Sequence, residues 1–311
     1  MAQFQRDAGL TARMVLSFAI LAVLYLVFLG VLAYLGVGYI PIAIIGAGIV
    51  LAQWYFSDKI VMWTSGAKVV TKEQYPRLHA IVGRLAAENG LPMPKIAVMD
   101  TQLPNAFATG KSPKSAVVAA TTGIMNMLDD DELEGVLAHE LTHVRNRDVL
   151  VITLASLFSI VAFSLMRFGL FSTMFGGGYG YGGGYYYGRG NGQSNNGGGA
   201  SAMVIVIIVA AVTWFVSFLM IRAISRYREF AADRGSAQMT RKPEKLASAL
   251  LKISGKIKAA PQRELERVSN LNTFFIVPAM ISRSSLSNLF STHPPVEERV
   301  RRLMAMQSLL K

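Results

Sequence analysis

The chain has 311 residues, a net charge of +12 and no cysteine. The absence of cysteine excludes a disulfide framework, thiolate metal ligands and a thiol nucleophile. Hydrophobic residues make up 52% of the chain, the mean hydropathy is +0.38, and the apolar residues gather in long uncharged runs. The excess of Lys and Arg therefore indicates membrane topology and anionic lipid headgroups rather than nucleic acid.

The first uncharged run predicts a transmembrane hairpin. Met14–Ser57 contains no Asp, Glu, Lys or Arg over 44 residues, which is too long for one membrane span and suits two. We expect an N-terminal segment and hairpin over residues 1–57, with spans at about 14–35 and 40–56. The Gly-containing stretch at residues 36–39 is the expected turn between them.

Residues 58–148 are predicted to form the first half of a soluble domain. Tyr75–Asn89 has the apolar spacing of an amphipathic helix, whereas Lys95–Asp100 and Ser115–Thr121 have the composition of short strands. Pro104–Gly110, between the two strands, consists mostly of small residues. This stretch is either an exposed strand edge that pairs with an extended peptide or a plain hairpin loop, and its composition does not choose between them.

A His-Glu-x-x-His motif is the strongest sign of chemistry in the chain. On a helix, His139 and His143 lie one turn apart on the same face, so that both rings can reach one ion. Glu140 can then deprotonate a water molecule on that ion, which is the logic of zinc peptidases. The acidic residues 129–131 offer N-cap oxygens, and no proline follows, which predicts a helix over 133–147.

Two later runs predict a second transmembrane hairpin. We expect spans at 149–172 and 201–222, joined by an extracytoplasmic loop at 173–200 in which 13 of the 25 residues of Phe175–Gly199 are glycine. The uncharged runs within these spans are Val149–Met166 and Ser201–Ile221, and only two of the 31 Lys and Arg, Arg167 and Arg189, fall between them. By the positive-inside rule, both termini and both halves of the soluble domain are then cytoplasmic.

A zinc site needs a third protein ligand, and residues 223–311, the second half of the soluble domain, offer two candidates. Glu229 and Asp233 are four residues apart on a segment of helical character, so one can bind the metal while the other accepts the N–H of a ligand histidine. We favour Glu229, because a membrane hairpin would bring its helix beside the histidine helix. The other candidate, His293, precedes two prolines in a turn and could donate to a developing oxyanion.

In combination, these motifs resemble the HtpX family of membrane-embedded zinc metallopeptidases, which are relatives of the CAAX prenyl endopeptidases. The resemblance covers most of the chain and rests on Pro104–Ala108, Glu132–Leu133, His139–His143, Asn146–Asp148, Ser225–Asp233, Ser291–Pro295 and Glu298–Arg299. The Gly/Tyr-rich loop departs from the usual pattern of the family but lies outside these motifs.

The resemblance implies a mainly α integral membrane protein with four transmembrane helices and a cytoplasmic α+β, zincin-like peptidase domain that contains a small β-sheet. It implies one zinc ion per subunit with Glu140 as catalytic base and Asp233 as a partner of a ligand. The implied zinc ligands are His139, His143 and Glu229. The implied substrate and oxyanion groups are Asn105, Ala106, Phe107 and His293.

The expected function is that of a membrane-bound zinc endopeptidase. It would cut misfolded or membrane proteins at the cytoplasmic face of the plasma (inner) membrane, in quality control or stress response. Its expected partners are polypeptides and the lipid bilayer, not nucleic acid, and the sequence sets no oligomeric state. Two rival classes are a transporter or channel with a regulatory metal site and a non-catalytic scaffold. The near absence of ionisable residues within the spans opposes the first, and Glu140 beside His139 opposes the second.

Overall fold

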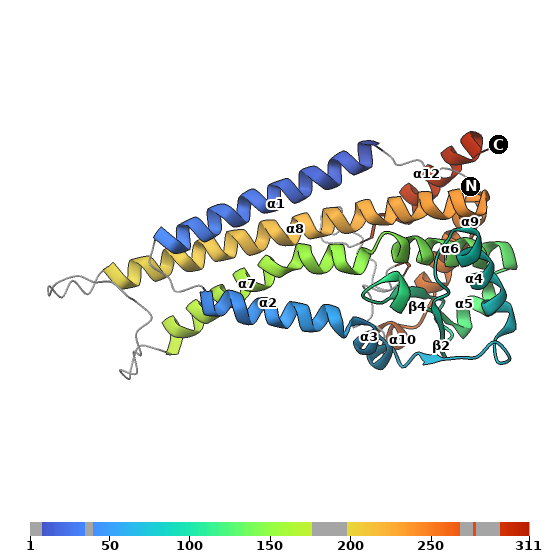
Figure 1. The fold of residues 1–311 in the computed structure, drawn as a ribbon, viewed down its shortest axis with the longest axis horizontal. Coiled ribbons are helices and arrows are strands. Elements are labelled where there is room, and N and C mark those ends of the chain that lie inside the picture. Colours follow the sequence, from blue (N-terminus) through green and yellow to red (C-terminus); the bar gives the residue numbers. More distant parts are fainter. Residues whose placement is uncertain (1–7, 35–39, 176–197, 268–275, 278–292, 311) are drawn as a thin grey trace. The chain divides into compact units, whose positions relative to one another are not determined.

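The computed structural model describes residues 8–34, 40–175, 198–267, 276–277 and 293–310 (Figure 1). The chain divides into two compact units. One comprises Trp54–Val151 and Arg222–Lys311 with residues 8–11, and the other comprises Ala12–Gln53 and Ile152–Ile221. The fold is mainly helical with one small mixed sheet. Residues 176–197 of the Gly/Tyr-rich loop and the turn at 36–39 lie outside the described residues, whereas both ends of the predicted loop are helical.

The described part of the second unit consists of four long helices. They are α1 (Ala8–Tyr34), α2 (Ile40–Tyr55), α7 (Asp148–Phe175) and the first part of α8 (Gly198–Thr240). Long apolar runs favour helices here, because a helix satisfies its own backbone groups where no water is available. Three of the helices share a buried apolar cluster, made by Phe28, Leu32, Val161, Ala162, Val206 and Ala210.

Two described helices are long and apolar enough to cross a bilayer, Thr11–Tyr34 and Val204–Thr240. A third span is possible if Ile44–Tyr55 and Ser57–Ser65, a broken helix pair, count as one. The helix α7 covers the third predicted span, but several of its side chains lie outside the described part of the chain. The chain is therefore a membrane protein with two to three candidate spans, and the four-span arrangement, its orientation and the domain boundaries stay predictions.

The sheet of the first unit has four strands in the order β1-β2-β4-β3. The central strands β2 (Lys95–Met99) and β4 (Val117–Thr121) run parallel. The outer strands, β1 (Lys68–Val69) and β3 (Ala106–Thr109), are each antiparallel to their neighbour. Pro104–Gly110, for which the sequence left two interpretations open, thus contains the strand β3. Its Phe107 lies opposite Ala119 of β4.

Helices and the sheet enclose one main core. The helices are α4 (Pro76–Glu88), α5 (Thr122–Met127), α6 (Asp130–Arg145), α9 (Pro243–Lys258) and α12 (Val296–Leu310). Leu85, Leu137 and Leu250 are fully buried there together with Leu303. The described part of this unit also contains the end of α8 and three shorter elements: α3 (Ser57–Ser65), the 3-10 turn η1 (Pro113–Ser115) and α10 (Gln262–Arg267).

A capping box starts α6 at the place that the sequence predicted. Asp129 accepts the N–H of Glu132 at 2.8 Å, and Glu132 accepts the N–H of Asp129 at 3.1 Å. The Glu132 side chain is almost fully buried and also binds Ser248 and Lys252 of α9, each at 2.7 Å. The same carboxylate therefore begins the helix and ties it to its neighbour.

Candidate metal centre

Small residues let two helices of the first unit approach closely. A Cβ atom at Gly235 of α8 would lie 2.3 Å from the Thr142 side chain of α6, so only glycine fits there without a shift. Nearby, Ser236 donates to the Gly135 carbonyl oxygen at 2.7 Å. This close packing brings the histidines of α6 beside the carboxylates of α8.

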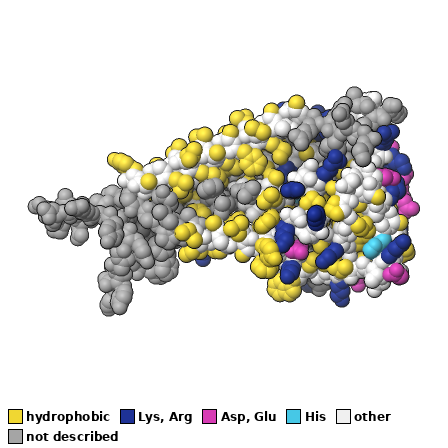
Figure 2. Space-filling view, viewed as in Figure 1, with side chains coloured by type: hydrophobic (Ala, Val, Ile, Leu, Met, Phe, Trp, Pro, Cys, Tyr) yellow, Lys and Arg dark blue, Asp and Glu magenta, His cyan; other side chains and the backbone are white. Residues whose placement is uncertain are grey.

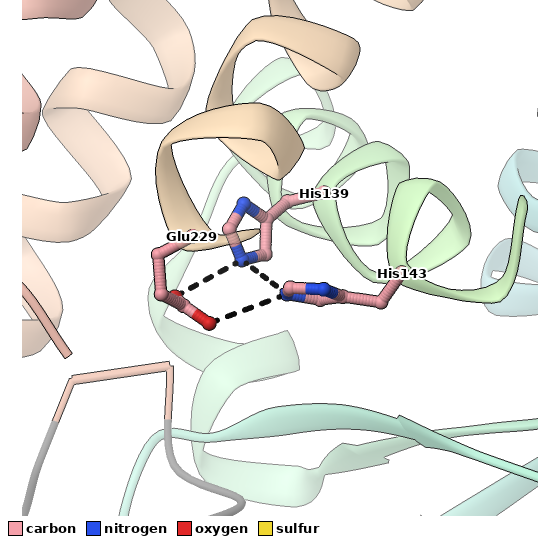
Figure 3. A group of neighbouring side chains, drawn as sticks. All are labelled: His139, His143 and Glu229. Carbon is pink, nitrogen blue, oxygen red and sulfur yellow. Dashed lines mark hydrogen bonds and ion pairs between the residues drawn. The ribbon is translucent and has the colours of Figure 1, made fainter. Parts of the chain in front are cut away.

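The three predicted ligands meet at one point (Figure 3). The Nε2 atoms of His139 and His143 are 3.1 Å apart, and the Glu229 carboxylate oxygens lie 3.6 Å and 3.5 Å from them. All three donor atoms fall within 4.8 Å of one another. Tetrahedral zinc with bonds of about 2.0–2.1 Å places neighbouring ligand atoms about 3.3 Å apart, which fits this spacing.

Two carboxylates fix the orientation of the imidazoles. The Nδ1 atom of His143 is 2.5 Å from Asp148, and the Nδ1 atom of His139 is 3.0 Å from Asp233. Each Nδ1 therefore carries the proton that it donates, which leaves both Nε2 lone pairs directed at the same point. Two lone pairs 3.1 Å apart repel each other unless a cation or a proton lies between them.

The buried charges around this point also favour a divalent cation. Counted as ionised, four buried carboxylates face two buried guanidinium groups, which leaves two negative charges unbalanced. The carboxylates are Glu140, Asp148, Glu229 and Asp233, and the guanidinium groups are Arg228 and Arg299. An uncompensated buried charge is costly, so a doubly charged cation suits this cluster.

The ionisation of the buried groups agrees with this charge balance. Burial alone would lower the pKa of His139, but hydrogen bonds to Asp233 and Glu229 raise it to about 9. Without a metal, the cluster thus holds a proton where a cation would bind. Burial also raises the pKa of Glu140, more than the nearby His139 and His143 lower it.

Arg299 also belongs to the cluster, and reasoning from the sequence assigned it no role. It comes from α12, is 1% exposed and forms a two-point contact with Asp233 at 2.9 Å and 2.6 Å. It also lies 3.3 Å from Glu229 and donates to the Ile276 carbonyl oxygen at 2.8 Å. The resemblance includes this arginine, but only the folded chain shows that it contacts Asp233.

Asp148 and Arg228 were also missed by reasoning from the sequence. Asp148 begins α7 and binds both His143 and, at 2.9 Å, Arg228 of α8. Burial raises the pKa of Asp148, but Arg228 and His143 together lower it below its ordinary value. The spacing from His143 to Asp148 was a usable signal, because a carboxylate just beyond the helix can turn back to the last histidine.

The predicted substrate residues lie in different surroundings. The buried Asn105 side chain accepts the Ile276 N–H at 3.1 Å, and the Phe107 side chain packs in an apolar cluster with Val61 and Ala119. Ala106 pairs with Ala120 at the start of β3. The strand β3 contacts α6, and its Ala108 N–H reaches the Glu140 carboxylate. Their substrate role stays a prediction.

His293 lies beside the three ligands without belonging to their set. It is buried, and its Nδ1 atom is 3.2 Å from the Glu229 carboxylate. Among the described residues, only His139, His143 and Glu229 form a group with metal-ligand spacing. The oxyanion role of His293 therefore remains a prediction, now with a position next to the centre.

Comparison with known proteins agrees with the site. The model of peptidase family M48 matches residues 72–307. Protease HtpX homolog 2 of Methanosarcina mazei is 47% identical over 98% of both chains. A Protease HtpX homolog of Moorella thermoacetica is 48% identical over 98% of this chain and 97% of its own.

A solved structure supports the fold alone. Ste24p of S. mikatae superposes with a TM-score of 0.55 at 17% identity, covering 93% of this chain and 64% of that one. Together with the donor group on α6 and α8, the near full-length relatives establish the family. This chain belongs to peptidase family M48 and is a membrane metalloprotease of the HtpX type.

Proposed function

We propose that the chain is a zinc-dependent endopeptidase whose metal is held by His139, His143 and Glu229. The observation that carries this proposal is the meeting of three donor atoms within 4.8 Å beside the buried Glu140. Two nitrogens and one carboxylate oxygen form the donor set of catalytic zinc sites that keep a fourth position open. Zinc bound there supplies Lewis acidity, which lowers the pKa of a coordinated water toward about 7 and polarises a carbonyl group.

The surrounding residues supply proton transfer, ligand orientation and oxyanion binding. Glu140 takes the proton of the attacking water and delivers it to the leaving amine. Asp233 and Asp148 keep the histidine Nδ1 atoms protonated, so that both Nε2 atoms can bind metal. We assign to His293, which lies next to Glu229, the donation of a hydrogen bond to the developing oxyanion.

The substrate is proposed to lie extended along β3. This strand is last in the sheet order, so β4 is its only partner in the described sheet, and it contacts the helix that carries Glu140. An extended peptide can add to such an edge through main-chain hydrogen bonds, which are independent of side-chain identity. Asn105 holds the segment of Ile276 beside Arg299, near the start of the strand.

We further propose misfolded or membrane proteins as substrates, cut at the cytoplasmic face of the plasma membrane as part of quality control or stress response. An unfolded chain can extend along β3, whereas a compact domain cannot. The Lys and Arg bias of the sequence supports the cytoplasmic side, and the motif resemblance to the HtpX family is the ground for the role.

The test uses the full chain in detergent and a loosely folded protein as substrate. We expect about one zinc per chain, cleavage that a chelator stops and zinc restores, and a Glu140→Gln variant that keeps zinc but loses at least about 100-fold in rate. A Glu229→Ala variant should lose the metal itself, and His293→Ala should keep it with a lower kcat. Protein that contains no bound ion after purification with zinc present would contradict the proposal. Full activity in Glu140→Gln would contradict it as well.

A further inference from the structure

One short helix of the first unit exposes an unusual apolar stripe. In α3, Val61 packs into the cluster of Ala97, Val117 and Ala119, so this side faces the sheet. Trp63 is 85% exposed and Ile60 is 44% exposed. Phe56, at the N-cap, is 43% exposed.

These three exposed residues share one face of the helix. Phe56, Ile60 and Trp63 follow the spacing i, i+4, i+7, which places them in a single row. A row of large apolar side chains on a helix that already buries its other side indicates a second apolar or half-apolar neighbour. Tryptophan has an apolar ring with one polar N–H, a combination enriched at the boundary between lipid and water.

Two lysines lie near the start of this row. Lys59 lies 5.7 Å from the Phe56 ring, and Lys111 lies 3.4 Å from the ring of Tyr55. Lys114, in η1, is exposed, whereas α3 itself carries a single acid, Asp58. Figure 2 shows apolar side chains bordered by Lys and Arg on this part of the surface, at its lower centre. The charge complements an anionic surface.

The position of α3 in the chain identifies the occupant. It follows α2 after one residue, and α2 exposes large apolar side chains such as Ile45, Ile49 and Leu51 along its length. A helix of 16 residues spans about 24 Å, which covers most of a hydrocarbon core of about 30 Å, so the predicted span at 40–56 ends close to a membrane boundary. The next helix therefore begins at the level of the lipid headgroups.

We propose that the α3 row, formed by Phe56, Ile60 and Trp63 and flanked by Lys59 and Lys111, docks in the headgroup region of an anionic lipid leaflet. The apolar side chains enter the boundary between headgroups and acyl chains, and the lysines bind lipid phosphates. The inference does not depend on the metal centre. Because α3 contacts β3, this docking also braces the strand beside the catalytic helix from the membrane side of the unit.

The test makes Trp63 the only tryptophan of the full chain, through Trp54→Phe and Trp214→Phe. The protein is placed in vesicles of phosphatidylcholine with or without phosphatidylglycerol, with bromine near the headgroup or deep in the acyl chains. We expect blue-shifted Trp63 emission and stronger quenching by shallow than by deep bromine. Quenching should increase with phosphatidylglycerol and fall with salt.

Two comparisons decide the outcome. Lys59→Glu with Lys111→Glu, in the same single-tryptophan chain, should abolish the effect of phosphatidylglycerol at unchanged thermal unfolding. A control chain whose only tryptophan is Leu251→Trp, on the exposed side of α9, should stay unquenched. Water-like, unquenched Trp63 emission in anionic vesicles would overturn the proposal. Blue-shifted emission without quenching would also overturn it, because a protein would then cover the row.

Discussion

At the scale of single residues, the proposed metal centre depends on side chains outside its proposed ligand set. Arg299 reaches His139 through Asp233. Its guanidinium group binds Asp233 at two points, and Asp233 in turn binds His139. The planar guanidinium group of arginine directs two N–H groups at one carboxylate, which a lysine ammonium group cannot do. We therefore regard Arg299 as a positioning residue for the ligand His139.

This role gives a prediction for metal affinity. Arg299→Met should weaken zinc binding by about 10- to 100-fold, because Asp233 loses its orientation and a buried negative charge is left without its partner. Arg299→Lys should recover part of the loss. Competition with a coloured chelator measures both. Arg301→Met, an exposed neighbour on α12, is the matched control. Wild-type affinity in folded Arg299→Met would show that Asp233 needs no such support.

At the scale of elements, the capping box of α6 links the start of the catalytic helix to α9. Glu132 accepts bonds from the Asp129 N–H, Ser248 and Lys252, and its side chain is 3% exposed. Burial alone would raise the pKa of Glu132, but the bonds to Lys252, Ser248 and the Asp129 N–H together lower it below the ordinary 4.5. The ionised form is therefore the one that stabilises the helix.

The lowered pKa of Glu132 predicts that the stability of the chain depends on pH. A carboxylate whose pKa is lower in the folded chain adds stability above its unfolded pKa and loses it as the pH falls through the folded value. Glu132→Gln should lower the free energy of unfolding by about 1–2 kcal/mol at pH 7, and the difference from wild type should shrink as the pH falls below about 4.5. Thermal unfolding in detergent measures this. Asp130→Asn, exposed on the same helix, should change little. A difference that grows toward acid pH would contradict the assignment.

At the scale of the whole molecule, two distant parts of the chain contribute to the proposed metal site. The histidines precede the stretch Ile152–Ile221, which belongs to the other compact unit, and Glu229 follows it. Both parts must return to the same side of the membrane for the ligands to meet. An even number of crossings between Val151 and Arg222 satisfies this requirement.

The absence of cysteine makes the topology directly testable. A single cysteine at Ser194, in the Gly/Tyr-rich loop, should react with a membrane-impermeant maleimide in intact cells. A cysteine at Lys114, exposed in the first unit, should react only after the membrane is opened. The cysteine-free parent sets the background. The reverse labelling pattern would invert the proposed orientation.

The features predicted well are those set by neighbours in the sequence. The histidine pair, its helix and the start of that helix at Asp129 follow from spacings of three and four residues, which one helical turn converts into contacts. Long apolar runs likewise indicate membrane helices, because their length alone matches a bilayer. Glu229 could be chosen from the sequence as well, because two helices that flank a membrane hairpin leave the membrane on the same side.

What the sequence determined by itself was thus the metalloprotease class, the helix that carries the His-Glu-x-x-His motif, and the membrane setting. The tertiary structure decided the partners of that chemistry. Arg299 reaches Asp233 across 66 positions, Asn105 holds Ile276 across 171, and β3 becomes a strand only by pairing with β4. Such contacts depend on how helices and sheet pack around a common core, and packing of that kind leaves no periodic pattern in the chain.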